Sequence, residues 1–142
     1  MSSIDTYPDG SSRGRLRLEE ASSKTEQDGR IAATVRLEWR GTAVECGAEG
    51  LQTREGLLRL GAEATVQAVA LLVKDGASPE LLGVKVVRAF SSWVAMACIR
   101  VEIDGEARDL LGARALQDED FVRGGAIAVL DALNRVLPAR LG

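Results

Sequence analysis

The sequence predicts an α+β fold of two tandem βββα units, in which each antiparallel sheet is covered by one helix. Two observations predict it. The segment GAIAVLDALNRVL, which starts at Gly125, has an earlier echo in GAEATVQAVALLV, which starts at Gly61. The same offset of 64 residues relates the preceding strand patterns, for example Val35 to Ile99. We therefore interpret the chain as one block copied in tandem.

The first copy contains three strand patterns and one helix pattern. RLRLEEAS (15–22) alternates weakly, IAATVRLEW (31–39) alternates strictly, and TAVECGAE (42–49) follows a turn at Gly41. Asp28-Gly29 predicts a hairpin between the first two strands. From 53 to 73, apolar residues recur at steps of three and four, which predicts an amphipathic helix with Thr53 or Gln52 near its start.

The second copy repeats this order after the break KDGASPE, where Gly76 suits a helix end. LLGVKVVRAF (81–90), WVAMACIRVEI (93–103) and EARDLLGARAL (106–116) predict strands, with turns at the serine pair 91–92 and at Asp104-Gly105. The last helix is expected from about Asp118 to Leu137. Repeat one then spans about 15–75 and repeat two about 80–138, together one domain (15–142).

The offset between the copies slips to 65 near Gly47 and Gly112 and returns to 64 in the helices. The helices are rich in alanine, which predicts that each helix lies close on its sheet. Gly61 and Gly125 permit the closest approach, because glycine has no side chain.

Composition bounds the class of protein. The 142 residues are 46% hydrophobic and carry a net charge of −3, with acidic and basic residues interleaved, so we expect no nucleic-acid partner. No run of 18 apolar residues predicts a membrane span. Residues 1–14 lack a signal-peptide core and predict a disordered tail. The two cysteines predict reduced, buried thiols in a cytoplasmic protein.

One strand has two apolar faces. Ala95 and Ala97 lie on one side of the strand 93–103, whereas Val94, Met96 and Cys98 lie on the other. One helix covers only one face of a three-stranded sheet, so the second face requires the sister repeat or a second chain. We expect a homodimer.

The closing segment GARALQDEDFVRGGAIAVLDALNRVL resembles the C-terminal regulatory domain of alpha-isopropylmalate synthases, which citramalate synthase shares. In that family the second repeat closes on the pattern dG, G, D, A, A, ALNR. The residues that match it are Asp104-Gly105, Gly112, Asp120, Ala126, Ala132 and the run Ala132-Leu133-Asn134-Arg135. The resemblance covers roughly residues 31 to 138.

The resemblance implies a dimer-forming allosteric module that binds an end-product amino acid and signals to a separate TIM-barrel catalytic domain. These 142 residues hold the module alone, so we do not expect synthase activity. The first repeat departs from the family, because GAEGLQTREG lacks the usual Pro-x-Asp-Ala. The second has Ala113-Arg114-Ala115 where more glycine is usual.

Any effector is expected at the strand-to-helix junctions, because glycines there allow close approach and N–H groups at a helix start suit a carboxylate. Arg114 would meet a carboxylate and Glu49 an ammonium group. The alternative is that these residues are turn glycines and solvated charges. The candidate ligand-binding residues are Gly47, Glu49, Gly50, Gly112 and Arg114.

The sequence gives little support for catalysis. There is no histidine, so the potential nucleophiles Ser91, Ser92, Cys46 and Cys98 lack their usual activating base. We expect no enzyme, no cofactor and no metal. Two classes of function stay open. One is a regulatory module for an amino-acid-like or carboxylate effector, and the other is an interaction or scaffold subunit, with a separate protein partner, that has lost effector binding.

Overall fold

The computed structural model describes residues 15–73 and 79–137. In these residues the chain forms two three-stranded antiparallel sheets, each followed by one helix, so the predicted duplicated βββα fold is confirmed. The tail predicted for residues 1–14 and the break expected at Gly76 lie outside the described residues.

The first repeat is built around a central strand whose alternate side chains are buried. Its elements are β2 (Arg17–Thr25), β3 (Ile31–Trp39), β4 (Thr42–Gly50) and α1 (Arg54–Leu72). The helix starts where predicted, because the Thr53 hydroxyl accepts a hydrogen bond from the Gly56 N–H at 2.9 Å.

The second repeat follows the same order. Its elements are β5 (Glu80–Ala89), β6 (Ser92–Ile103), β7 (Glu106–Leu116) and α2 (Phe121–Leu133). The last helix is shorter than predicted. It begins after Asp120, whose carboxylate accepts a hydrogen bond from the Arg123 N–H at 3.1 Å, so Asp118 and Glu119 precede the helix.

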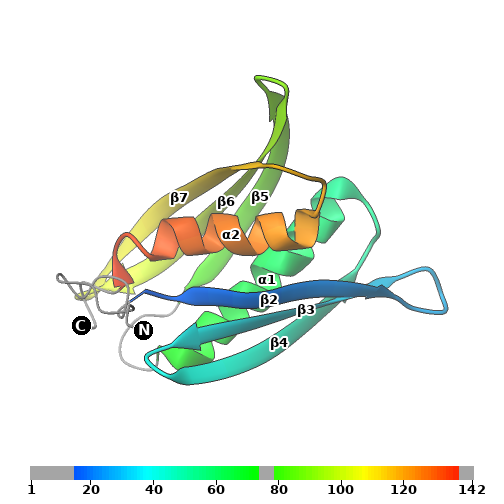
Figure 1. The fold of residues 1–142 in the computed structure, drawn as a ribbon. Helices are drawn as coiled ribbons and strands as arrows, with labels where there is room; N and C mark the ends of the chain where they lie inside the picture. Colours follow the sequence, from blue (N-terminus) through cyan, green and yellow to red (C-terminus); the bar gives the residue numbers. More distant parts are fainter. Residues whose placement is uncertain (1–14, 74–78, 138–142) are drawn as a thin grey trace, which may run out of the picture.

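The two helices lie between the two sheets (Figure 1). α1 packs on β3 and β4 of its own sheet and also on β5, and α2 packs on β6 and β7 and also on β2. The inner faces of both sheets therefore share one hydrophobic core with both helices. Each repeat covers the inner face of the other, and the outer faces point away from this core.

The helices cross at the two echoed glycines. A side chain at Gly61 would overlap the carbonyl oxygen of Val122, and one at Gly125 would overlap the carbonyl oxygen of Leu58. The two contacts are related by the offset of 64 residues, so they are equivalent. The glycines were predicted to bring helix and sheet together. They instead bring the two helices together.

The pairing of strands keeps one offset throughout the second hairpins. Ala33 lies opposite Ala48, and 64 residues later Ala97 lies opposite Gly112. The predicted slip to 65 is therefore wrong. It came from matching Gly47 with Gly112 by letter, whereas these two glycines occupy different positions of the sheet.

Two-residue loops with positive φ at both residues close three of the hairpins, at Arg40-Gly41, Phe90-Ser91 and Asp104-Gly105. The predicted turn at the serine pair 91–92 is therefore one residue too late. Because β6 is longer than β3, with 12 residues against 9, the β5–β6 hairpin projects from the molecule (Figure 1).

Candidate functional site

The five residues with a predicted ligand role lie in strands, and the prediction that they occupy the strand-to-helix loops is wrong. Gly47, Glu49 and Gly50 belong to β4, with Gly50 as its last residue, whereas Gly112 and Arg114 belong to β7. β4 and β7 are in different sheets, and both helices lie between these sheets. The single chain therefore holds the five residues at two separate places.

Gly112 has a packing role. It is buried, and a side chain there would overlap the carbonyl oxygen of Ala128 and lie 2.8 Å from the backbone nitrogen of Ala132. The glycine thus allows α2 to lie directly on β7. Gly47 is exposed, and a Cβ there would lie 3.1 Å from the carbonyl oxygen of Ala33.

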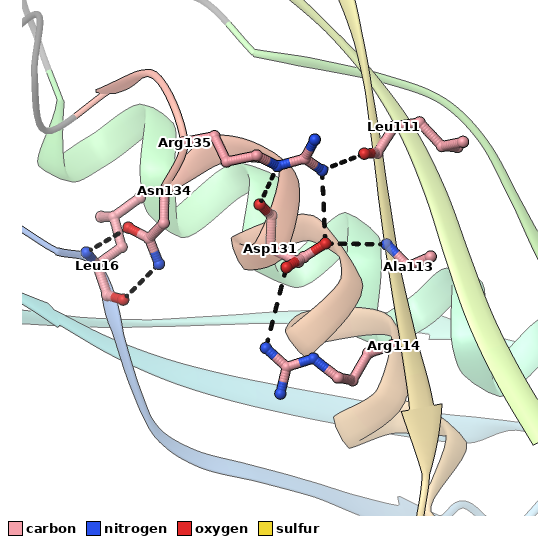
Figure 2. A network of polar contacts seen from close by, with 7 residues as sticks. All are labelled: Leu16, Leu111, Ala113, Arg114, Asp131, Asn134 and Arg135. Carbon is pink, nitrogen blue, oxygen red and sulfur yellow. Dashed lines mark hydrogen bonds and ion pairs between the residues drawn. The ribbon is translucent and has the colours of Figure 1, made fainter.

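The charge of Arg114 is paired within the chain. Its Nη2 lies 3.9 Å from Oδ1 of Asp131 on α2, and Oδ2 of the same carboxylate accepts a hydrogen bond from the Ala113 N–H at 3.1 Å (Figure 2). Arg135, one turn further along the chain, donates to the carbonyl of Leu111 and to the carbonyl of Asp131. The sequence signal for Arg135, favourable charge at a helix C-terminus, identified only the second contact.

Asp131 and Arg135 cover the free edge of β7. Alternate residues of an edge strand direct their backbone N–H and C=O groups away from the sheet, and Leu111 and Ala113 are two such residues. Asp131 accepts from Ala113 and Arg135 donates to Leu111, so these outward groups are satisfied by side chains of α2. We call Asp131 and Arg135 the edge lock of β7.

Repeat one has no edge lock. At the offset of 64 residues, Gln67 and Leu71 stand in the place of Asp131 and Arg135, and neither side chain makes a hydrogen bond in the described residues. Gln67 is exposed and Leu71 is 54% exposed. The outer edge of β4 is therefore open where the edge of β7 is closed.

The outer face of the second sheet is apolar at its centre. Met96 and Cys98 of β6 are half-buried and lie in register with an exposed alanine and with Leu111, which is 52% exposed. Further apolar residues on this face are Val87, Val94 and Ala115. One end of the face is charged, where Arg100 Nε lies 2.8 Å from Asp109 Oδ1.

The outer face of the first sheet is polar at the equivalent positions. Ala32 replaces Met96, Thr34 replaces Cys98 and Gly47 replaces Leu111. Arg36 of this face binds Glu19, with 2.9 Å between Nε and Oε1. The apolar outer face therefore belongs to repeat two alone.

An aromatic cluster joins the two strand-to-helix junctions. Trp93, at the start of β6, meets the ring of Phe121 edge-on at 5.9 Å, and Phe121 is the first residue of α2. The guanidinium groups of Arg54, the first residue of α1, and of Arg88 lie 4.6 Å and 5.0 Å from the Trp93 ring centroid. The sequence gave Trp93 an anchoring role, and these contacts are consistent with it.

The helix starts are not open to an anion. The Thr53 hydroxyl occupies one N–H group of the first turn of α1, and the Asp120 carboxylate occupies one of α2. A carboxylate already present at the start of α2 repels a second one. The geometry expected for an effector carboxylate at these junctions is thus partly filled by the chain itself.

Few ionisable groups in the described residues are perturbed. The pKa of Asp109 is lowered mainly by the hydrogen bond from Arg100, and the same contact raises the pKa of Arg100. Burial raises the pKa of the Cys46 thiol, which reduces its thiolate fraction. Both cysteines are free and half-buried, so the predicted full burial is wrong.

The comparisons with known proteins leave the class of protein to the fold and the site. The sequence matches no protein-family model, and no curated protein matches it. Within the described residues, no helix is both long and apolar enough to span a membrane.

Proposed function

We propose that this chain is a non-catalytic interaction module that pairs with a second copy through the outer face of its β5-β6-β7 sheet. The observation that carries the proposal is the difference between the two outer faces. Repeats with the same fold and the same inner contacts differ at Met96, Cys98 and Leu111, where only repeat two exposes apolar side chains.

The arrangement of this face supports self-association. An apolar centre with a charged end, formed by Arg100 and Asp109, matches the usual anatomy of a protein interface. Strand spacing and rise give the face roughly 500 Å² in projection, and a standard interface buries about 800 Å² per partner. The proposed dimer is therefore of modest affinity, and association has to be measured at tens of micromolar.

The resemblance to the regulatory domains of alpha-isopropylmalate synthases supports the same proposal, because those domains form dimers. We place the module in the cytoplasm. Effector binding is not part of the proposal, since Arg114 is paired with Asp131 and the five candidate residues lie at two separate places. The proposal thus corresponds to the interaction class of function.

The test compares two equivalent substitutions by analytical ultracentrifugation. Met96→Glu places a carboxylate at the centre of the apolar face, opposite Lys85 of β5. Its control, Ala32→Glu, places one at the equivalent position of repeat one, opposite Lys24 of β2. We expect the unmodified protein and the control to be dimers, and Met96→Glu to be a monomer. An unmodified protein that is monomeric at tens of micromolar overturns the proposal.

A further inference from the structure

Three of the four sheet edges carry a feature that prevents pairing with another strand. β2 has a register shift between Leu18 and Glu20, and β5 has one between Leu81 and Gly83. β7 has its edge lock. Bulges and covering groups are the means by which natural proteins protect sheet edges. β4 has neither of these features in the described residues.

β4 is regular along its whole length. It pairs with β3 without a register shift from the Trp39–Thr42 pair to the Ile31–Gly50 pair. Gly47 and Glu49 occupy the positions equivalent to Leu111 and Ala113, so their N–H and C=O groups point outward. Within residues 15–73 and 79–137 these outward groups make no hydrogen bond. They form a template for one more strand.

The charges along β4 select the kind of strand. Glu45 and Glu49 lie on the same outer face, one on each side of Gly47, and both are exposed. Neither carboxylate has a basic partner within the described residues. An antiparallel pairing of two copies centred on Gly47 would set Glu45 opposite Glu49 of the other copy at two places. Like charges directly opposite each other destabilise a pair of strands, so a second copy is disfavoured.

We propose that the edge of β4 binds an extended basic segment of a partner protein, which adds to the β2-β3-β4 sheet as a fourth strand. Basic residues four positions apart would face Glu45 and Glu49. The residues between them would alternate to the inner side, beside Cys46 and near the partly exposed Leu71 of α1, so this side prefers apolar residues. This surface is separate from the proposed dimer face on the other sheet.

The probe is a fluorescently labelled peptide with the sequence Thr-Lys-Val-Thr-Val-Lys-Thr, blocked at both ends. We expect it to raise the fluorescence anisotropy on binding, with an affinity that falls as salt is added. Replacing both lysines by glutamate should abolish binding. N-methylation of the central threonine removes one backbone donor and should also weaken binding. A methylated peptide that binds as well as the parent overturns strand addition.

The sharpest variant transfers the edge lock to repeat one. Gln67→Asp with Leu71→Arg copies the residues that close the edge of β7, and should raise the dissociation constant of the peptide by about tenfold or more. The matched control, Gln67→Asn with Leu71→Met, changes the same two exposed positions without a lock and should bind like the unmodified protein. Equal binding by the locked variant and its control overturns the proposal.

Amide hydrogen exchange locates the contact. The outward N–H groups of Gly47 and Glu49 should exchange quickly in the free protein and slowly with the peptide bound. If both are already protected in the free protein, the edge is occupied by another part of the chain or by a second copy, and the proposal is wrong. Repeating the measurement on Met96→Glu separates this result from the fate of the proposed dimer.

Discussion

At Gly61 and Gly125 the two repeats carry the same residue and make the same contact, since each glycine receives the backbone of the other helix. On the outside the counterparts differ. Thr34 of the first sheet corresponds to Cys98 of the second, and Gln67 of α1 corresponds to Asp131 of α2. The inner positions of one copy thus meet the other copy, whereas the outer positions meet solvent or partners.

This difference separates folding from function within one small chain. A substitution at the helix crossing must suit two backbones, so both copies retain glycine there. An outer substitution has few neighbours to satisfy, so each copy was able to acquire its own surface. Repeat two acquired an apolar face and a closed edge, and repeat one has a polar face and an open edge.

The largest effect is expected at the helix crossing. In Gly125→Ala the new methyl group would overlap the backbone carbonyl of Leu58, which cannot move without shifting α1. We expect a loss of about 3 kcal/mol in the free energy of unfolding, measured with denaturant. Gly61→Ala should lose a similar amount, because its contact with Val122 is equivalent.

The neighbouring glycine supplies the control. A methyl group at Gly124 would meet the side-chain methyl groups of Leu116, the nearest at 2.9 Å, and this side chain is able to rotate. Alanine also stabilises a helix interior relative to glycine by about 0.5–1 kcal/mol. Gly124→Ala should therefore lie within about 1 kcal/mol of the unmodified protein. Equal losses at 124 and 125 would contradict the equivalence of the two crossing contacts.

A smaller effect is expected where repeat two holds the start of repeat one. The Asn134 side chain accepts from the Leu16 N–H at 2.8 Å and donates to the Leu16 carbonyl at 3.0 Å. Two hydrogen bonds of about 1 kcal/mol each predict that Asn134→Ala loses about 2 kcal/mol in a denaturant titration.

Repeat one has Ala70 at this position, and it is exposed. Ala70→Asn should cost only the difference in helix propensity, about 0.6 kcal/mol. If the two substitutions had the same cost, the contact between Asn134 and Leu16 would contribute nothing to stability.

The elements themselves were predictable because their signals are local. The alternation of Ile31 to Trp39 and the turn residues Asp104-Gly105 depend only on neighbours in the chain, and the structure confirms both. The start of α1 was equally readable from Thr53. The duplication then followed from the constant offset between the copies.

The contacts between elements were less predictable. The glycine letters alone suggested a match of Gly47 with Gly112, but the strand pairing aligns Gly112 with Ala48. The edge lock joins α2 to β7 across 18 residues, from Asp131 to Ala113, and no local pattern marks it. The available signal was the comparison of the aligned helices, in which Asp131 stands against Gln67.

The smallest expected effect concerns the charged end of the outer face. In repeat two Arg100 binds Asp109 across the β6–β7 pair, whereas in repeat one Arg36 binds Glu19 across the β2–β3 pair. The pKa of Asp109 is lowered from its ordinary value of 3.8, chiefly by the hydrogen bond from Arg100. Its contribution to stability is therefore present above that value and is lost as the pH falls through the depressed pKa.

We expect Asp109→Asn to be slightly less stable than the unmodified protein at pH 7, and the difference to vanish below the depressed pKa of Asp109, where the aspartate is protonated and neutral. Since both partners are exposed, the difference should be small and should shrink further in high salt. Thermal melts at several pH values measure it. A difference that persists unchanged in acid would mean that shape or hydrogen bonding, rather than charge, joins β6 to β7 at this end of the face.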